Sequence, residues 1–417
     1  MSDPTHLRPS DLRGYSRLAI DATLGLADLV ESLHHTIARA PRPLARPGGG
    51  RTKGITGLVY RIVRGVTRLV GGSLEALLRQ LEKVLAEKRS SAEREAVLAA
   101  LNGVLGDHLA ATGNPLAIPM RLRREGVALA LERAALQAAI AGPGPRVLVL
   151  IHGLCMNDLQ WNRQGRDHGR ALADAAGFTA LYLHYNSGLH VSTNGRELAG
   201  LLETLVREWP VPVEELVIVG HSMGGLVARS ACHYAEEAGH AWRKRLTKLF
   251  FLGTPHHGAP LERGGNWVDL VLDSSAYTAP FARLGRIRSA GITDLRHGSL
   301  LDEDWAGRDP FARRTVPRRP PPLPQGVDCY AIAATTGKRV GSLGDRLLGD
   351  GLVPLASALG RHPGKGRDPL FPESRRWIGV GMNHLDLLGR PEVAERILGW
   401  LAEDGADRPR SPAESRA

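Results

Sequence analysis

Cysteine, lysine and long apolar runs are all scarce in this 417-residue sequence. The three cysteines lie far apart, which excludes both a disulfide framework and the close ligand spacing of a zinc site. Nowhere do about eighteen apolar residues follow one another, so no membrane-spanning helix is predicted. The N-terminal residues are polar and include acids, unlike the basic start and apolar core of a signal peptide. We therefore expect a cytoplasmic protein.

Positive charges exceed negative charges by 11 at pH 7, yet only seven of the 54 basic residues are lysine. A genome biased towards arginine codons explains this excess as well as a polyanionic partner does. The sequence has no helix-turn-helix pattern, no zinc-finger spacing and no aromatic RNA-binding motif. No nucleic-acid partner is therefore expected.

The spacing of apolar residues changes near residue 118. Residues 1–117 place apolar side chains at intervals of three and four, which predicts an N-terminal helical accessory region interrupted by a Pro/Gly-rich linker. Residues 118–404 instead alternate short, wholly apolar runs with helical patterns, as in a sheet with helices on both faces. The sequence thus predicts an α/β fold with a mostly parallel, doubly wound sheet. The expected strands are 146–153, 179–185, 215–222, 248–255, 327–336 and 375–380.

Two further segments complete the predicted organisation. Residues 259–325 are too long for an ordinary connection, and their aromatic content argues against disorder in their first part. These aromatic residues are Trp267, Tyr277, Phe281, Trp305 and Phe311. Residues 405–417 are polar and are predicted to form a disordered tail.

The third predicted strand runs into Gly220-His221-Ser222-Met223-Gly224, and a helical pattern follows at once. The bare pattern Gly-x-Ser-x-Gly occurs by chance in many chains. Between a strand and a helix, however, it is typical of a nucleophile elbow, in which the serine occupies a strained turn between closely packed elements. Ser222 is therefore the predicted nucleophile, and a serine in an ordinary Gly-rich turn is the alternative.

A nucleophilic serine needs a base that accepts its proton. His384 follows the last predicted strand, where a loop residue can reach back to the elbow, so it is the predicted base. The rivals are His184 after a mid-sheet strand, His221 in the elbow and expected to point away, and His256 and His257, which follow the fourth strand and can line the site.

The base needs an acid that orients it. Asp350 begins a turn, Asp-Gly, after the penultimate strand and is the predicted acid. Asp345 is the nearest competitor, and spacing does not exclude it. The order serine, acid, histidine is the one expected for this fold.

The oxyanion needs N–H donors. The first expected donor is the backbone N–H of Met223, which follows the nucleophile. The second should come from the loop after the first strand, where Gly153 allows a sharp turn and Leu154 supplies the N–H.

Five motifs in this order resemble the lipase/esterase branch of the α/β-hydrolase superfamily. They resemble above all bacterial triacylglycerol lipases and hydrolases akin to GPI-inositol deacylases. The motifs are VLVLIHGLCMN, GHSMGGLVARS, FLGTPHHGAP, DGLVP and GMNHLDLL, within residues 118–402. The resemblance implies an α/β-hydrolase fold in which residues 259–325 form a cap or lid whose aromatic residues line the acyl site.

The same resemblance assigns roles to individual residues. It implies that Ser222 is the nucleophile, Asp350 the orienting acid and His384 the general base. Leu154 and Met223 are implied as oxyanion donors. The residues expected to line the substrate site are His152, Gly153 and His257.

Some secreted bacterial lipases bind calcium through an aspartate two residues after the catalytic histidine, and Asp386 matches that position. A hard cation needs several oxygen ligands. No convincing second aspartate is present, because Asp345 is too close to Asp350. Neither a metal nor another cofactor is therefore predicted.

Residues 54–87 form a basic amphipathic pattern, with Arg61, Arg64 and Arg68 on one helical face and apolar residues on the other. Such a helix can lie on an anionic membrane, which would make the protein peripheral on the inner membrane surface. The alternative is an accessory layer packed on the hydrolase domain, and we favour it.

The leading functional hypothesis is a serine carboxylester hydrolase that acts on a small-molecule or lipid ester with an apolar acyl group. An acyltransferase or amidase with the same triad is one alternative. A catalytically silent scaffold that binds a membrane or a partner is another. The sequence makes no prediction of the oligomeric state.

Overall fold

A computed structural model of the chain describes six stretches of sequence. They are residues 8–39, 90–259, 289–307, 321–339, 349–361 and 370–403. Several predictions therefore lie outside the described residues. These concern the amphipathic segment 54–87, the tail 405–417, Asp345, and most of the cap with Trp267, Tyr277, Phe281 and Phe311.

The chain forms two compact units. Residues Met1–Arg94 and Leu109–Ala117 make up the first unit, and residues Glu95–His108 and Ile118–Ala417 the second. The predicted boundaries at 117 and 404 stay predictions. Residues 95–108, which the prediction assigns to the N-terminal region, nevertheless group with the sheet.

The first unit contains the long helix α1 (Pro9–Arg39), which lies within the predicted N-terminal helical region. Asp11 in its first turn accepts a hydrogen bond from the N–H of Arg8 at 2.8 Å. The same carboxylate pairs with Arg94 at 2.5 Å. None of the described helices has both the length and the apolar character needed to cross a membrane.

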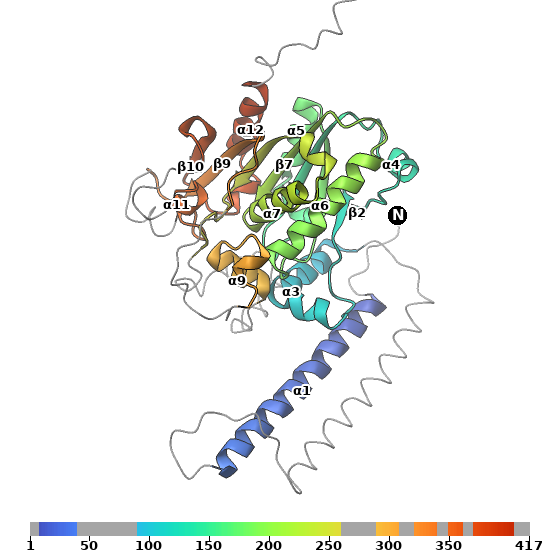
Figure 1. Ribbon diagram of the computed structural model, residues 1–417, viewed down its shortest axis with the longest axis vertical. Helices are drawn as coiled ribbons and strands as arrows, with labels where there is room; N and C mark the ends of the chain where they lie inside the picture. Colours follow the sequence, from blue (N-terminus) through green and yellow to red (C-terminus); the bar gives the residue numbers. More distant parts are fainter. Residues whose placement is uncertain are drawn as a thin grey trace, which may run out of the picture. The chain divides into compact units, whose positions relative to one another are not determined.

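The second unit is built on one eight-stranded sheet, with strand order β10-β9-β8-β7-β3-β6-β1-β2 (Figure 1). The six strands from β10 to β6 are parallel, and β1 and β2 join them antiparallel at one edge. The predicted strands are all present, as β3 (Arg146–Ile151), β6 (Thr179–His184), β7 (Glu215–His221), β8 (Leu246–Leu252), β9 (Asp328–Thr335) and β10 (Arg376–Val380). The prediction of a mostly parallel α/β sheet is therefore confirmed.

The strands β1 (Arg121–Arg124) and β2 (Val127–Ala128) were not predicted. Both are short, and the sequence of β1, RLRR, lacks the apolar run that marks the other strands. An edge strand needs to bury only part of its surface, and charged side chains there discourage pairing with other chains. A second small sheet pairs β4 (Asn162–Arg163) with β5 (Arg166–Asp167).

Helices cover both faces of the large sheet (Figure 1). One face packs against α5 (His168–Ala176) and α12 (Pro391–Glu403), through alternate strand residues such as Leu150 and Phe250. On the other face, Phe251 contacts α7 (Met223–Glu237), which packs against α6 (Val191–Glu208) at Gly195. Shorter helices are α4 (Arg133–Ala139), α9 (Ala290–His297) and α11 (Leu355–Ala358). The remaining long helix, α3 (Ala92–Ala111), contributes residues 95–108 to this unit.

The packing of α12 against the sheet depends on Trp400. Its indole is 1% exposed and packs against the rings of Phe250 and Tyr330. We expect Trp400→Ala to lower the free energy of unfolding by about 3–5 kcal/mol, because it opens a large cavity. Urea denaturation measures the loss. The half-buried Trp377 is the matched control, and equal losses for the two alanine variants would contradict this view of the core.

Candidate active site

Ser222 lies in a strained turn between β7 and α7. Its backbone angles are φ 53° and ψ −121°, which residues other than glycine rarely adopt. The flanking glycines make the turn possible. A Cβ at Gly220 would lie 2.6 Å from the amide nitrogen of Gly225, and a Cβ at Gly224 would overlap a carbonyl oxygen of β3. The strand, turn and helix expected of a nucleophile elbow are therefore present.

His384 and Asp350 form a buried pair. Nδ1 of His384 lies 2.7 Å from Oδ2 of Asp350, and the two side chains are 2% and 1% exposed. The other carboxylate oxygen accepts hydrogen bonds from the N–H groups of Leu352 and Val353 at 3.0 and 2.8 Å. Within the described residues, Nε2 of His384 has no hydrogen-bond partner. The nitrogen that a general base needs is thus available.

The end of β8 lies next to both Ser222 and His384. The N–H of Ser222 donates to the carbonyl oxygen of Leu252 at 2.8 Å. At the next residue, Gly253, a Cβ would lie 2.9 Å from Cε1 of His384. Ser222 and the His384–Asp350 pair, which are far apart in the chain, therefore both lie beside the end of β8 at the carboxyl edge of the sheet.

His221 also lies in the site, although the sequence interpretation has it point away. Its ring centroid is 4.6 Å from that of His384, and its Nε2 lies 3.2 Å from the carbonyl oxygen of His384. Burial above all, and then the neighbouring His384, hold the pKa of His221 well below its usual range. A neutral His221 can donate from Nε2 to that carbonyl, so it contacts the predicted base directly.

The predicted oxyanion donors belong to two segments that adjoin the nucleophile, the start of α7 and the loop after β3. Met223 is the first residue of α7, where a backbone N–H has no acceptor within the helix. Leu154 follows Gly153, at which a Cβ would lie 3.0 Å from Cβ of Ser222. The loop after β3 thus passes directly beside Ser222.

The other predicted substrate-lining residues differ in their surroundings. The ring of His152 is fully buried and stacks on Tyr185 at 4.4 Å, and burial lowers its pKa to about 3. His257 is half-buried after β8, and its N–H donates to Oγ of Ser357 at 3.2 Å. His256 is buried and its Nδ1 lies 3.1 Å from Nη1 of Arg229. Contact of His152, Gly153 or His257 with a substrate stays a prediction.

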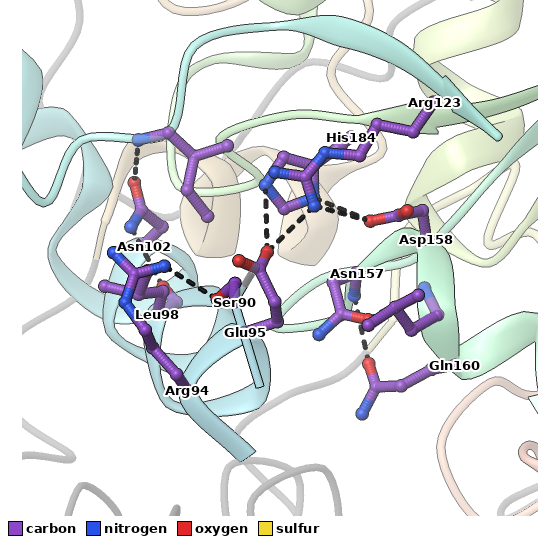
Figure 2. A network of polar contacts seen from close by, with 12 residues as sticks. Ser90, Arg94, Glu95, Leu98, Asn102, Arg123, Asn157, Asp158, Gln160 and His184 are labelled. Carbon is purple, nitrogen blue, oxygen red and sulfur yellow. Dashed lines mark hydrogen bonds and ion pairs between the residues drawn. The ribbon is translucent and has the colours of Figure 1, made fainter. Parts of the chain in front are cut away.

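His184, a rival for the base, belongs to another group of side chains (Figure 2). Its Nδ1 lies 3.0 Å from Oδ1 of Asp158, and its Nε2 lies 3.6 Å from Oε2 of Glu95. Nη1 of Arg123 approaches the same two oxygens, at 3.1 and 2.9 Å. We call Glu95, Arg123, Asp158 and His184 the ion-pair cluster.

The ion-pair cluster has the spacing of a metal site. The ligating atoms of Glu95, Asp158 and His184 all lie within 4.8 Å of one another. The guanidinium of Arg123, however, already hydrogen-bonds both carboxylates and supplies the compensating positive charge. The donor set therefore fits an ion-pair network better than a divalent cation.

Asp386, which matches the position of a calcium ligand in some bacterial lipases, hydrogen-bonds within its own loop. Its Oδ2 accepts a hydrogen bond from the N–H of Asn383 at 2.8 Å. In the described part of the chain, no group of three ligating side chains includes Asp386.

Comparisons with known proteins give one family match and several similar solved structures. Residues 143–317 match the family model of the PGAP1-like alpha/beta domain. No curated protein matches the sequence. Among solved structures, lipase BlEst2 of Bacillus licheniformis in mature form is 17% identical, with 63% of this chain and 95% of that chain covered and a TM-score of 0.40.

Two further solved structures are similar. For lipase B of Aspergillus fumigatus, the identity is 14%, the coverage 64% of this chain and 57% of that chain, and the TM-score 0.36. For phospholipase PlaB of Legionella pneumophila, the identity is 14%, the coverage 54% and 49%, and the TM-score 0.32. The sheet order, the nucleophile elbow and the family match over residues 143–317 together support the predicted α/β-hydrolase fold, and the predicted resemblance to this superfamily is confirmed.

Proposed function

We propose that this protein is a serine carboxylester hydrolase that cleaves esters with an apolar acyl group through an acyl-Ser222 intermediate. The observation that carries the proposal is the buried His384–Asp350 pair at 2.7 Å, next to a serine in a strained elbow. Strain of this kind persists only where the surrounding structure enforces it, and it is concentrated at functional sites. The motif resemblance supports an acyl ester as the substrate class.

In the first step, Oγ of Ser222 attacks the acyl carbon while Nε2 of His384 accepts the hydroxyl proton. Asp350 accepts the Nδ1–H hydrogen bond, which keeps the second nitrogen free and stabilises the imidazolium. The carbonyl oxygen becomes an oxyanion, and the N–H groups of Leu154 and Met223 stabilise its charge.

The tetrahedral intermediate then collapses. His384 returns its proton to the alcohol oxygen, the ester bond breaks, and Ser222 remains acylated. Water attacks the acyl group by the same route and gives its proton to His384. The acid leaves, and Ser222 regains its proton from His384.

A panel of p-nitrophenyl esters of graded acyl length tests the proposal. We expect turnover that rises with acyl length from acetate onwards, because a longer apolar chain buries more surface. Parallel assays of the matching anilides, and of transfer to added alcohols, separate ester hydrolysis from amidase and acyltransferase activity. A folded protein that releases no p-nitrophenol from any ester would contradict the proposal.

The position of the imidazole makes a further prediction. Gly253 has φ +59°, and a Cβ there would lie 2.9 Å from Cε1 and 3.0 Å from Nδ1 of His384. Gly253→Ala should displace the ring and lower kcat by about 100-fold, the effect of a misplacement of roughly 1 Å. Steady-state kinetics measures it. Gly399→Ala is the control, because a Cβ there meets nothing within 4 Å, and equal rates for wild type and Gly253→Ala would refute the placement.

A further inference from the structure

The loop that carries the proposed oxyanion donor Leu154 is strained at the next residue. Cys155 has φ 57°, a left-handed conformation that residues other than glycine seldom adopt. Its N–H donates to Oγ of Ser187 at 3.0 Å. Burial raises the pKa of its thiol to about 12, so the side chain is a packing group and not a nucleophile. A strained conformation needs neighbours that enforce it.

Residues of α3 supply one such neighbour. A Cβ added to Gly103 would overlap Sγ of Cys155 and would lie 2.9 Å from its Cα, so the helix backbone rests directly on the strained residue. Sγ of Cys155 also lies 3.9 Å from the carbonyl oxygen of Ala100. The middle of α3 therefore supports the donor loop without an intervening side chain.

The ion-pair cluster supports the same loop at its far end (Figure 2). Asp158 begins the 3-10 turn that directly follows the loop. Its carboxylate contacts His184 of β6 and Arg123 of β1, and Glu95 of α3 contacts both of these. The figure shows Glu95 reaching from the helix towards the other three side chains.

The cluster is well shielded from water. The side chains of Glu95, Asp158 and His184 are 5%, 2% and 4% exposed, and that of Arg123 is 16% exposed. Burial acts to raise the pKa of Asp158, but the hydrogen bond to His184 and the charges of His184 and Arg123 lower it below its usual value. Loss of Glu95 would remove its contacts with Arg123 and His184, and the buried side chains that remain would have to rearrange.

From these contacts we infer that Glu95 and Gly103 of α3 are positioning residues for the oxyanion loop. Both residues precede the family match at 143–317, and neither touches Ser222 or His384 in any described contact. Glu95 acts through Asp158 at one end of the loop, and Gly103 acts through Cys155 beside the donor. The inference rests on the proposed hydrolase function, because it assigns α3 a role in stabilising that reaction's oxyanion.

Kinetics of the full-length Glu95→Ala variant test the inference. Loss of one oxyanion donor lowers kcat by about 10²–10³-fold, so a displaced donor should lower it by about 10–100-fold. KM should stay within about twofold, because the donors act on the transition state and not on the bound ester. Phosphonylation of Ser222 by a fluorophosphonate should slow to a similar degree, since the same N–H groups bind the phosphonyl oxygen.

Three further variants make the test specific. Glu95→Gln still offers an oxygen to Arg123, so its kcat should lie between those of the wild type and Glu95→Ala. Glu93→Ala changes an exposed residue of the same helix and should leave kcat unchanged. Gly103→Ala places a methyl group against Cys155 and so displaces the loop beside the donor. It should reproduce the loss in kcat with an unchanged KM.

Each measured rate is divided by the fraction of folded protein, which circular dichroism gives. A loss of folded protein is then not counted as a loss of kcat. If Glu95→Ala and Gly103→Ala both keep the wild-type kcat per folded molecule, the inference is wrong while the hydrolase function stands. If the wild type itself neither hydrolyses esters nor reacts with the fluorophosphonate, the proposed function is wrong.

Discussion

Replacing Ser222 with alanine is expected to lower kcat for p-nitrophenyl ester hydrolysis by about 10⁴- to 10⁶-fold, with little change in thermal stability. The hydroxyl is the atom that forms the covalent bond to the acyl group, so its removal ends the acylation route. The residual rate comes from substrate binding and the oxyanion donors alone. The side chain is small and the turn is set by backbone angles, so the fold should persist.

Two measurements check this prediction. Steady-state kinetics gives the loss in kcat, and a thermal melt reports whether the variant is folded. Ser374→Ala is the matched control, because Ser374 is exposed and lies far along the chain from the elbow. A Ser222→Ala protein with more than about a tenth of the wild-type rate would show that another group performs the chemistry.

Asp350→Asn should be nearly as damaging, with kcat about 10⁴-fold lower. Oδ1 of Asp350 accepts from two backbone N–H groups, so the amide oxygen of asparagine should take that place. The amide nitrogen then faces Nδ1 of His384. A donor there forces the imidazole to carry its proton on Nε2, which can no longer accept the proton of Ser222.

This variant is nearly the same size as the wild type, so a lost rate with an unchanged melting temperature would point to the tautomer and not to the fold. Asp174→Asn is the control, because the side chain of Asp174 is 75% exposed. A kcat for Asp350→Asn within tenfold of the wild-type value would mean that another acid, such as Asp345, orients the base.

The parallel sheet is predictable because its strands are buried on both faces and therefore appear as unbroken apolar runs. The edge strand β1 carries no such signal, because three of its four residues are arginines, one of which, Arg123, belongs to the ion-pair cluster. Nothing in the sequence indicates that Glu95, 28 positions before Arg123, will contact that arginine. Such pairings depend on tertiary packing, which periodicity does not report.

The residues of the site likewise include some that the sequence predicts and some that it does not. Ser222 and His384 stand out because the elbow has a local pattern and the histidine follows the last strand. The contact of His221 with His384 is not predictable, because the two are 163 positions apart and only the folded turn sets the direction of the ring. The contact between Gly103 and Cys155 is not predictable for a related reason. A glycine within a helical pattern does not indicate which residue will pack against it.

Covalent trapping tests the central claim most directly. The folded wild-type protein is treated with a fluorophosphonate, digested, and mapped by peptide mass spectrometry. Our account predicts one phosphonylated residue, Ser222, with labelling strongly reduced in a His384→Ala variant that melts at the wild-type temperature. Labelling at any other residue, or none on fully folded wild-type protein, would contradict it.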